Sequence, residues 1–193
     1  MNSITTNPLV TIVTASYMKF DKIFETIKSV INQDYTNVEY IIADDGSPNF
    51  PEKDIVDYIN KMSPSMNYKI YHSDTNRGTV KNVNYAFKNS KGDYVFPLSC
   101  GDVFFSRDIV SKIVERFKAT KGKLIVTSRL FYEGDYKPIC LLPHYIDGRY
   151  YTKKLDTNTK QYGVYVGRLK SAIASGSAMY FTRDFLNELD YFD

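Results

Sequence analysis

The chain has 193 residues, of which 43% are hydrophobic and 24% are charged, so it can bury a substantial core and is not a disordered segment. Its 25 basic and 22 acidic residues give a net charge of +3, which is too even for nucleic-acid binding driven by charge. The sequence has no apolar run of the roughly 18 residues that a membrane span needs, and its N-terminus lacks the apolar segment of a secretion signal. The two cysteines and two histidines are not spaced as a disulfide framework or a metal motif, so we expect a reduced, cytoplasmic protein.

Short apolar, β-branched runs alternate with segments of helical period along the first two thirds of the chain. The runs predict strands over residues 9–14, 38–43, 68–72, 94–98 and 124–128. The segments between them predict amphipathic helices over residues 21–32, 55–62, 80 to near 91, and 108–120. Asp21 stands where it would cap the first helix. Alternation of this kind predicts an α/β fold with right-handed crossovers and a mainly parallel sheet.

The pattern changes after residue 128. Residues 129–170 are rich in tyrosine, lysine and turn residues and have no clean period, whereas residues 172–181 predict a loop and a strand, and 183–189 a short helix. Two interpretations stay open for the basic and aromatic segment 144–170. It holds an acceptor or a lipid phosphate at a membrane surface, or it is a solvated hairpin region packed by tyrosines.

Three loops at predicted carboxyl ends of strands carry polar or acidic residues: 15–19, 44–47 and 99–102. Ligands bind outside these strand ends in open α/β sheets, so we expect the three loops to share one site. Tyr17 offers an aromatic face to a base, and Asp44 and Asp45 can accept hydrogen bonds from a base or a ribose. Asp102 is an oxygen ligand of the kind that Mg²⁺ or Mn²⁺ prefers. The loops predict a site for a nucleoside diphosphate and a divalent ion.

Each of these residues also has a structural interpretation. Tyr17 would pack a loop, the Asp44–Asp45 pair would cap a turn, and Asp102 would cap the turn that follows it. Arg77 and Lys81 either neutralise a diphosphate or are solvated surface cations.

Several segments in this order resemble a family-two glycosyltransferase with the GT-A fold. The stronger ones are residues 9–17, 29–35, 39–47, Asn76-Arg77-Gly78, Asn84 and 91–95, and the weaker ones are Gly176-Ser177-Ala178 and Phe192-Asp193. The resemblance covers nearly the whole chain. It implies a GT-A, Rossmann-like fold with a mainly parallel central sheet and helices on both faces. It further implies a single nucleotide-sugar-binding domain over 1–193, in which 129–193 form the acceptor side.

The resemblance also implies roles for residues of the three loops. Residues 15–17 fall where the family holds the nucleobase, Asp45 where a carboxylate bonds uracil, with Asp44 beside it. Residues 99–102 fall on the acidic metal motif, of which this chain keeps only the last acid. With the two cations above, the candidate nucleotide-binding residues are Ala15, Ser16, Tyr17, Asp44, Asp45, Arg77, Lys81 and Ser99, and the candidate metal ligand is Asp102.

The activity that the resemblance implies is transfer of a sugar, most simply from a UDP-sugar, to a hydroxyl of a growing bacterial surface polysaccharide or lipid-linked glycan. The family implies inversion by a single displacement, with Mg²⁺ or Mn²⁺ held by Asp102. Such acceptors imply peripheral association with the inner face of the membrane. Two other functions stay open: a nucleotide-sugar-binding module without transfer activity, and a nucleotidyltransferase. A nucleotidyltransferase would require a glycine-rich basic loop after the first strand, and residues 15–19 do not form one.

Inverting transfer needs a general base at the acceptor hydroxyl. The resemblance places this acid a short way beyond Phe192-Asp193, whereas Asp184, Glu188 and Asp190 fall on or beside the last predicted helix. We therefore expect the base to lie beyond Asp193 and the chain to be a truncated form of a longer transferase, which binds a UDP-sugar but transfers it poorly.

Overall fold

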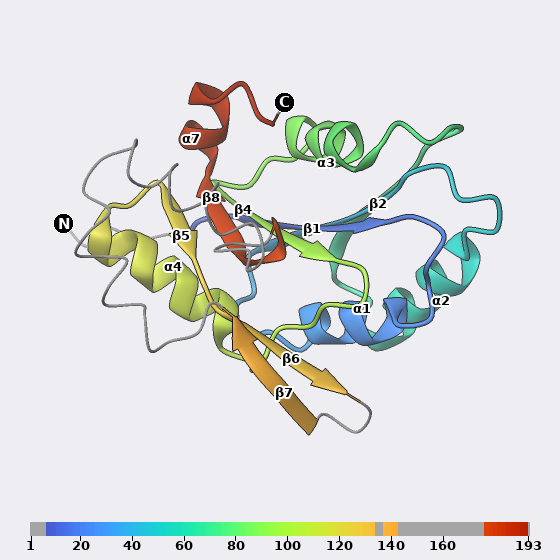
Figure 1. Cartoon of the computed structure of the whole chain (residues 1–193), viewed down its shortest axis with the longest axis horizontal. Coiled ribbons are helices and arrows are strands. Elements are labelled where there is room, and N and C mark those ends of the chain that lie inside the picture. Colours follow the sequence, from blue (N-terminus) through green and yellow to red (C-terminus); the bar gives the residue numbers. More distant parts are fainter. Residues whose placement is uncertain (1–6, 134–136, 143–175, 193) are drawn as a thin grey trace. The chain divides into compact units, whose positions relative to one another are not determined.

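Figure 1 presents a computed structural model of the chain, which describes residues 7–133, 137–142 and 176–192. The described residues form two compact units. One consists of those up to Ile125 together with those from Tyr180 onward, and the other of those between Val126 and Met179. All the candidate nucleotide and metal residues belong to the first unit.

A mixed, mostly parallel sheet has the strand order β3-β2-β1-β4-β8-β5. Its strands are β1 (Val10–Ser16), β2 (Val38–Asp44), β3 (Asn67–His72), β4 (Tyr94–Ser99), β5 (Leu124–Val126) and β8 (Met179–Thr182). β1 pairs in parallel with β2 and with β4, and β2 pairs in parallel with β3. β8 runs antiparallel to β4 and lies between β4 and β5. The predicted mainly parallel sheet is thus confirmed.

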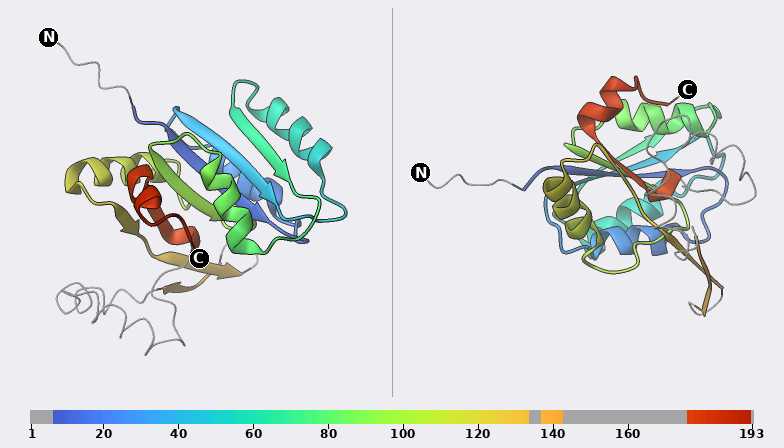
Figure 2. Two further views of the ribbon diagram at one scale, coloured as in Figure 1. Left: turned by 90° about the horizontal axis from the view of Figure 1, so that it is seen from above. Right: turned by 60° about the vertical axis from the view of Figure 1, so that its left-hand side comes forward.

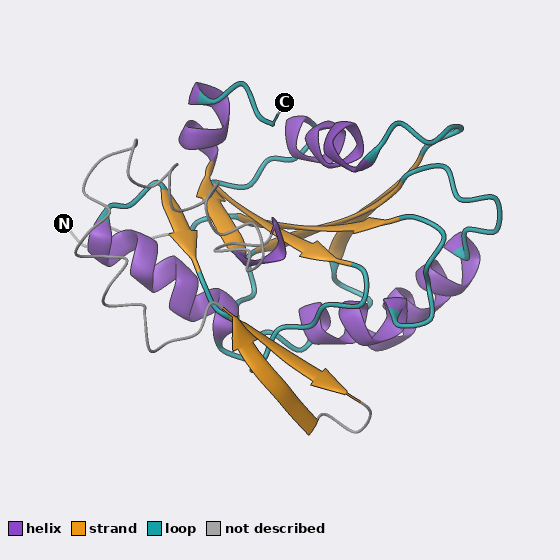
Figure 3. Ribbon diagram, in the orientation of Figure 1, coloured by secondary structure: helices purple, strands orange, loops and turns teal. Residues whose placement is uncertain are grey.

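Helices cover both faces of this sheet, as expected (Figures 1 and 2). The helices of the first unit are α1 (Ile23–Ile31), α2 (Glu52–Met62), α3 (Thr79–Lys88), α4 (Ile109–Thr120) and α7 (Arg183–Glu188). Figure 3 shows α1 and α2 on one face of the sheet and α3 on the other. Among the described residues no helix is long and apolar enough to cross a membrane.

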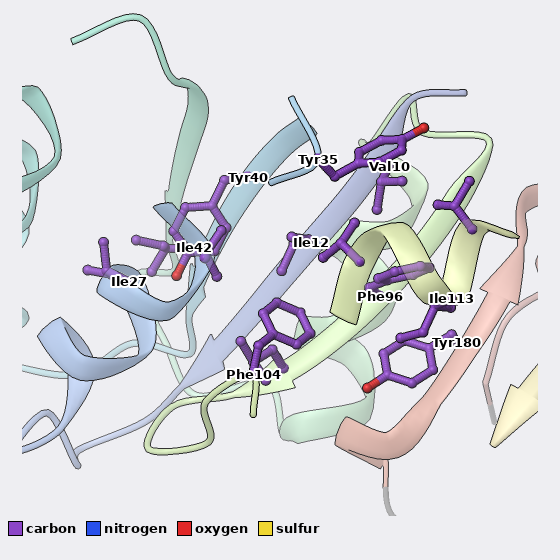
Figure 4. Packing of buried hydrophobic residues seen from close by; sticks show 14 of the residues in the cluster. Val10, Ile12, Ile27, Tyr35, Tyr40, Ile42, Phe96, Phe104, Ile113 and Tyr180 are labelled. Atoms are coloured by element: carbon purple, nitrogen blue, oxygen red, sulfur yellow. The ribbon is translucent and has the colours of Figure 1, made fainter. Parts of the chain in front are cut away.

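The main core lies on the α1 face of the sheet (Figure 4). The strands contribute side chains such as Ile12, Tyr40 and Phe96, which pack against Ile27 of α1 and Ile113 of α4. Successive side chains of a strand point to opposite faces, yet nearly every residue of β1 and β2 is buried, since helices cover both sides. Burial of each large apolar side chain stabilises the fold by about 1.5–3 kcal/mol. This rigid sheet sets the positions of the loops at its edge.

Two local expectations are corrected by the structure. Asp21 does not cap α1, because the helix begins at Ile23 with Lys22 at the cap position and no side-chain cap bond. The third helix ends at Lys88 rather than near residue 91, with Asn89 as its C-cap.

The second unit contains a hairpin that the sequence did not predict. β6 (Arg129–Glu133) pairs antiparallel with β7 (Lys137–Leu142), and the register shifts between Phe131 and Tyr132. This irregularity interrupts the alternation by which strands are recognised. A short 3-10 turn, Gly176–Ala178, precedes β8. Segment 144–170, for which two interpretations stay open, and Asp193 of the Phe192-Asp193 element lie outside the described residues.

Candidate functional site

The loops that follow β1, β2 and β4 meet at the carboxyl edge of the sheet (Figure 1). The backbone N–H of Asp45 donates to the carbonyl of Ser16 at 3.0 Å, and that of Cys100 donates to the carbonyl of Ala15, also at 3.0 Å. The three loops are therefore adjacent, as expected from the parallel pairing.

Asp44 is completely buried, and both of its carboxylate oxygens are engaged within the chain. Oδ1 accepts hydrogen bonds from the Ser16 hydroxyl at 3.1 Å and the Ser47 hydroxyl at 2.7 Å. Oδ2 accepts from the Ser47 backbone N–H at 2.8 Å and lies 2.9 Å from Nδ1 of His72. The role of Asp44 in nucleotide binding stays a prediction, and the structure gives this carboxylate a second task, which is to join three chain segments.

Asp45 is oriented differently and has fewer partners. Its carboxylate accepts one hydrogen bond, from the Arg77 backbone N–H to Oδ1 at 2.8 Å, and we find no further bond to it from the described residues. The next residue, Gly46, has a φ of +80°, and a Cβ there would lie 2.6 Å from the carbonyl carbon of Thr75. Only glycine fits this turn, which holds Asp45 against the loop before α3.

The two candidate cations differ in environment. The Arg77 guanidinium lies 4.6 Å above the ring of Tyr85, and its Nη2 donates to Asn82 Oδ1 at 3.3 Å. Its Nε is buried and has no hydrogen-bond partner in the described part of the chain. Lys81 is exposed on α3. Arg77 is therefore a packed side chain at the site, whereas Lys81 has the environment of a solvated surface cation.

Tyr17 is 47% exposed, so much of its ring is open for stacking rather than packed into a loop. The following residue, Met18, has a left-handed backbone with φ of 60°, and its N–H donates to the Ser47 hydroxyl at 2.8 Å. The end of the β1 loop is thus tied to the loop after β2.

The loop after β4 is held on α1. Gly101 donates its N–H to the Thr26 hydroxyl at 2.9 Å, and the Asp102 N–H donates to the Ser99 carbonyl at 2.9 Å. The described residues include no group of three or more His, Cys, Asp or Glu side chains that could hold a metal ion. A lone carboxylate such as Asp102 nevertheless fits Mg²⁺ or Mn²⁺ when phosphate oxygens and waters complete the shell.

The electrostatic environment of this loop is negative. Burial, together with the nearby carboxylates of Asp102, Asp21 and Asp44, raises the pKa of the Cys100 thiol to about 11. The thiol therefore stays protonated at neutral pH, and its Sγ donates to the Lys19 carbonyl at 3.2 Å. Negative charge gathered around a small loop favours a cation there.

Comparison with known proteins identifies the family. Residues 11–189 match the model of glycosyl transferase family 2. The chain belongs to this family. Among curated relatives, WfaP of Escherichia coli, named as a UDP-Glc:alpha-D-GlcNAc-diphosphoundecaprenol beta-1,3-glucosyltransferase, is 32% identical over 128 residues, which are 66% of this chain and 48% of WfaP. WcaA of Escherichia coli K12, a putative colanic acid biosynthesis glycosyl transferase, is 30% identical over 67% of this chain and 43% of its own.

Solved glycosyltransferases share the fold. S. aureus TarS 1–349 in complex with UDP-GlcNAc superposes with a TM-score of 0.71 at 16% identity, covering 96% of this chain and 48% of that one. The mannosyltransferase PcManGT of Pyrobaculum calidifontis, in complex with GDP-Man and Mn²⁺, gives a TM-score of 0.70 at 15% identity, covering 98% and 48%. The GT-A fold is thereby confirmed. This chain spans less than half the length of WfaP, WcaA and these two structures.

Two residues that join the loops were not predicted. His72 ends β3 and reaches Asp44, and Thr26 of α1 holds the loop after β4. His72 offered a usable signal, because it is the polar last residue of a strand that precedes a turn. Thr26 offered none, since it lies in the middle of an amphipathic helix.

Proposed function

We propose that this family 2 chain binds a nucleotide sugar, with UDP as the nucleotide, at the carboxyl edge of its sheet. In this proposal the whole protein transfers the sugar, with inversion, to a hydroxyl of a surface polysaccharide or lipid-linked glycan at the inner face of the membrane. The observation that carries the proposal is the proximity of the Asp45 and Asp102 loops, one suited to a base and the other to a metal. The family match favours a glycosyltransferase over a nucleotidyltransferase.

The base would lie between Tyr17 and Asp45. The exposed ring of Tyr17 offers a stacking face. Asp45 is only 3% exposed, but its Oδ2 has no hydrogen-bond partner among the described residues and would accept the imide N–H of uracil. Arg77 and Lys81 would lower the cost of bringing a diphosphate to the start of α3. The names of WfaP and of the TarS complex support UDP as the nucleotide.

Asp102 would hold the divalent ion, and the ion, when bound, stabilises negative charge on a departing diphosphate. The chain's own contribution is to fix Asp102 through the Ser99 carbonyl and the Gly101–Thr26 bond. Acids near the end of the described chain are engaged elsewhere: Glu188 pairs with Lys123 at 2.6 Å, and Asp190 lies 4.0 Å from Lys88. We assign no general base to them.

Calorimetry with UDP and Mn²⁺ tests the proposal. Asp45→Asn keeps the shape but turns one acceptor into a donor, and an unpaired buried polar group costs about 1–3 kcal/mol, so UDP affinity should fall about tenfold or more. Asp102→Ala should remove the dependence of UDP binding on Mn²⁺. The matched control is Asp57→Asn, on the exposed side of α2, which should bind as the parent does. Parent-like UDP affinity in both site variants would refute the proposal.

A further inference from the structure

A buried hydrogen-bond network lies beneath the proposed nucleotide site. It consists of Ser16, Asp44, Ser47 and His72, and we refer to it as the Asp44 network. Its members come from the end of β1, the loop after β2 and the end of β3, which are separated by up to 56 positions in the sequence but are neighbours at one edge of the sheet. Asp44 has no solvent exposure, so these contacts replace water for its charge.

The buried Ser47 connects the network to the exposed loop after β1. The Ser47 hydroxyl donates to Asp44 and accepts the N–H of Met18, so a single group ties the β1 loop to the buried carboxylate. Met18 has a left-handed backbone, which a residue with a side chain keeps only where its surroundings enforce it. Tyr17 directly precedes Met18, so this bond also sets the backbone that carries the Tyr17 ring.

His72, at the end of β3, contacts both Asp44 and Phe50. Its ring stacks on Phe50, with centroids 5.3 Å apart and planes within 4°, while Nδ1 contacts Asp44. The Phe50 N–H in turn bonds the Ser47 carbonyl at 3.3 Å. The ring and the carboxylate thus hold both ends of the segment from residue 44 to residue 50.

The two neighbouring acids have separate partners. Asp44 engages Ser16, Ser47 and His72, while Asp45 engages the backbone before α3. Asp44 faces four donors from within the chain, whereas Asp45 accepts one bond from the described residues. Of these two acids, Asp45 is therefore the one expected to contact the nucleotide directly.

We propose that Asp44, Ser47 and His72 are positioning residues that raise affinity for the base half of the nucleotide without touching it, by fixing the backbone of Tyr17 and Met18. This inference rests on the proposed function, because it needs UDP to bind at this edge. It predicts an effect confined to base recognition, because Ser47 holds Met18 in the loop after β1, whereas the Gly101–Thr26 bond holds the loop of Asp102 on α1.

The test measures binding of UDP and of inorganic pyrophosphate, each with Mn²⁺, to the full chain by calorimetry. Ser47→Ala removes the acceptor for Met18 and one donor to Asp44, and should weaken UDP about tenfold while leaving pyrophosphate affinity within about twofold of the parent. Ser47→Thr keeps the hydroxyl and should restore most of the UDP affinity. A purely structural loss would weaken both ligands together.

A second pair of variants keeps the test decisive if Ser47→Ala fails to fold. His72 is partly exposed, so its substitution is tolerated more easily. His72→Phe retains a ring to stack on Phe50 but lacks the donor to Asp44, whereas His72→Gln retains a donor. UDP should bind several-fold more weakly to His72→Phe than to His72→Gln.

The outcomes separate this inference from the function on which it rests. A parent that does not bind UDP overturns both. A parent that binds UDP, together with Ser47→Ala and His72→Phe that bind it equally well, overturns the positioning role alone. A parallel fall in UDP and pyrophosphate affinity overturns it as well.

Discussion

Strand β2 carries a buried acid at each end, and the two acids have different consequences. Glu39, at the amino end, accepts hydrogen bonds from the Thr11 hydroxyl, the Lys91 N–H and the Lys69 ammonium, at 2.7–2.8 Å. Asp44, at the carboxyl end, accepts from serines and faces His72. The partners of Glu39 join strands to one another, whereas the partners of Asp44 hold loops that carry candidate ligand contacts.

Location in the sheet, more than the chemistry of the carboxylate, separates the structural network of Glu39 from the network of Asp44 at the proposed site. Both carboxylates are desolvated and saturated with donors. Crossover helices in a parallel sheet return the chain to the amino edge, so that only the carboxyl edge gathers loops able to enclose a ligand. Disrupting the Glu39 end should therefore change stability alone, and disrupting the Asp44 end should change binding as well.

The largest loss of stability is expected from adding a side chain at Gly46 or Gly92, where a Cβ would clash with neighbouring atoms. Gly46→Ala combines a φ of +80° with a Cβ 2.6 Å from the Thr75 backbone, and should destabilise the chain by about 4 kcal/mol. Gly92→Ala places a Cβ 2.5 Å from the Thr11 hydroxyl near Glu39, and should cost about 3 kcal/mol. Urea unfolding measures both losses.

The two alanine variants should differ in binding. UDP affinity of the folded fraction, measured at low temperature, should fall in Gly46→Ala and stay parent-like in Gly92→Ala. An equal change of UDP affinity in the two variants would contradict the division between the edges.

Glu39→Gln should destabilise the chain by about 3 kcal/mol. The Glu39 side chain is 2% exposed, so the amide NH2 of glutamine would face buried hydrogen-bond donors. Lys69 is 35% exposed and would regain some hydration, which keeps the loss of stability at the lower end of the range of about 3–5 kcal/mol for a broken buried ion pair. Equilibrium unfolding in urea measures the loss, with the exposed Glu115→Gln on α4 as a control expected within about 0.5 kcal/mol of the parent. Loss of UDP affinity in folded Glu39→Gln would contradict the expectation that disruption at the amino edge changes stability alone.

The contribution of Glu39 should depend on pH. Burial acts to raise its pKa, but the hydrogen bonds from Lys69, Lys91 and Thr11 outweigh it and hold the pKa below the ordinary value of 4.5. A lowered pKa in the folded state means that the stabilisation is complete above the unfolded pKa and is lost as the pH falls through the folded value. The stability difference between parent and Glu39→Gln should therefore be constant well above pH 4.5 and shrink as the pH falls below it. A difference that grows on acidification would contradict the assigned direction.

The smallest change in stability is expected at Met18, whose backbone is left-handed. Glycine adopts the left-handed backbone of Met18 without steric cost, so Met18→Gly should raise stability by about 0.5 kcal/mol after the extra unfolded-state entropy is counted. The same change at Met62, the last residue of α2, should lower stability by about 1 kcal/mol, because glycine disfavours a helix. Thermal or urea unfolding of both variants measures the signs, and a loss at Met18 would show that its backbone is not strained.

The order of strands and helices from β1 to β5 was determined by the sequence alone, because periods of two and of three to four residues are local signals, whereas the β6–β7 hairpin was missed. Strand ends followed from the same signals, and with them the choice of residues such as Tyr17, Asp45 and Asp102 as candidates. Asn84, one of the residues that carry the family resemblance, donates from Nδ2 to the Phe192 carbonyl at 2.6 Å, a contact that the local pattern does not indicate.

The tertiary structure decided which polar groups meet. No periodicity indicates that His72 faces Asp44, that Ser47 holds Met18, or that Arg77 packs on Tyr85, since these contacts depend on strand register and on turns whose backbone angles are set by packing. It also decided that β8 lies between β4 and β5 and runs antiparallel to β4, because backbone hydrogen bonds at strand edges join segments far apart in the sequence and have no local signal. Pairwise contacts across many positions carry no local signature, and so the role of Asp44 as a junction became visible only in the folded chain.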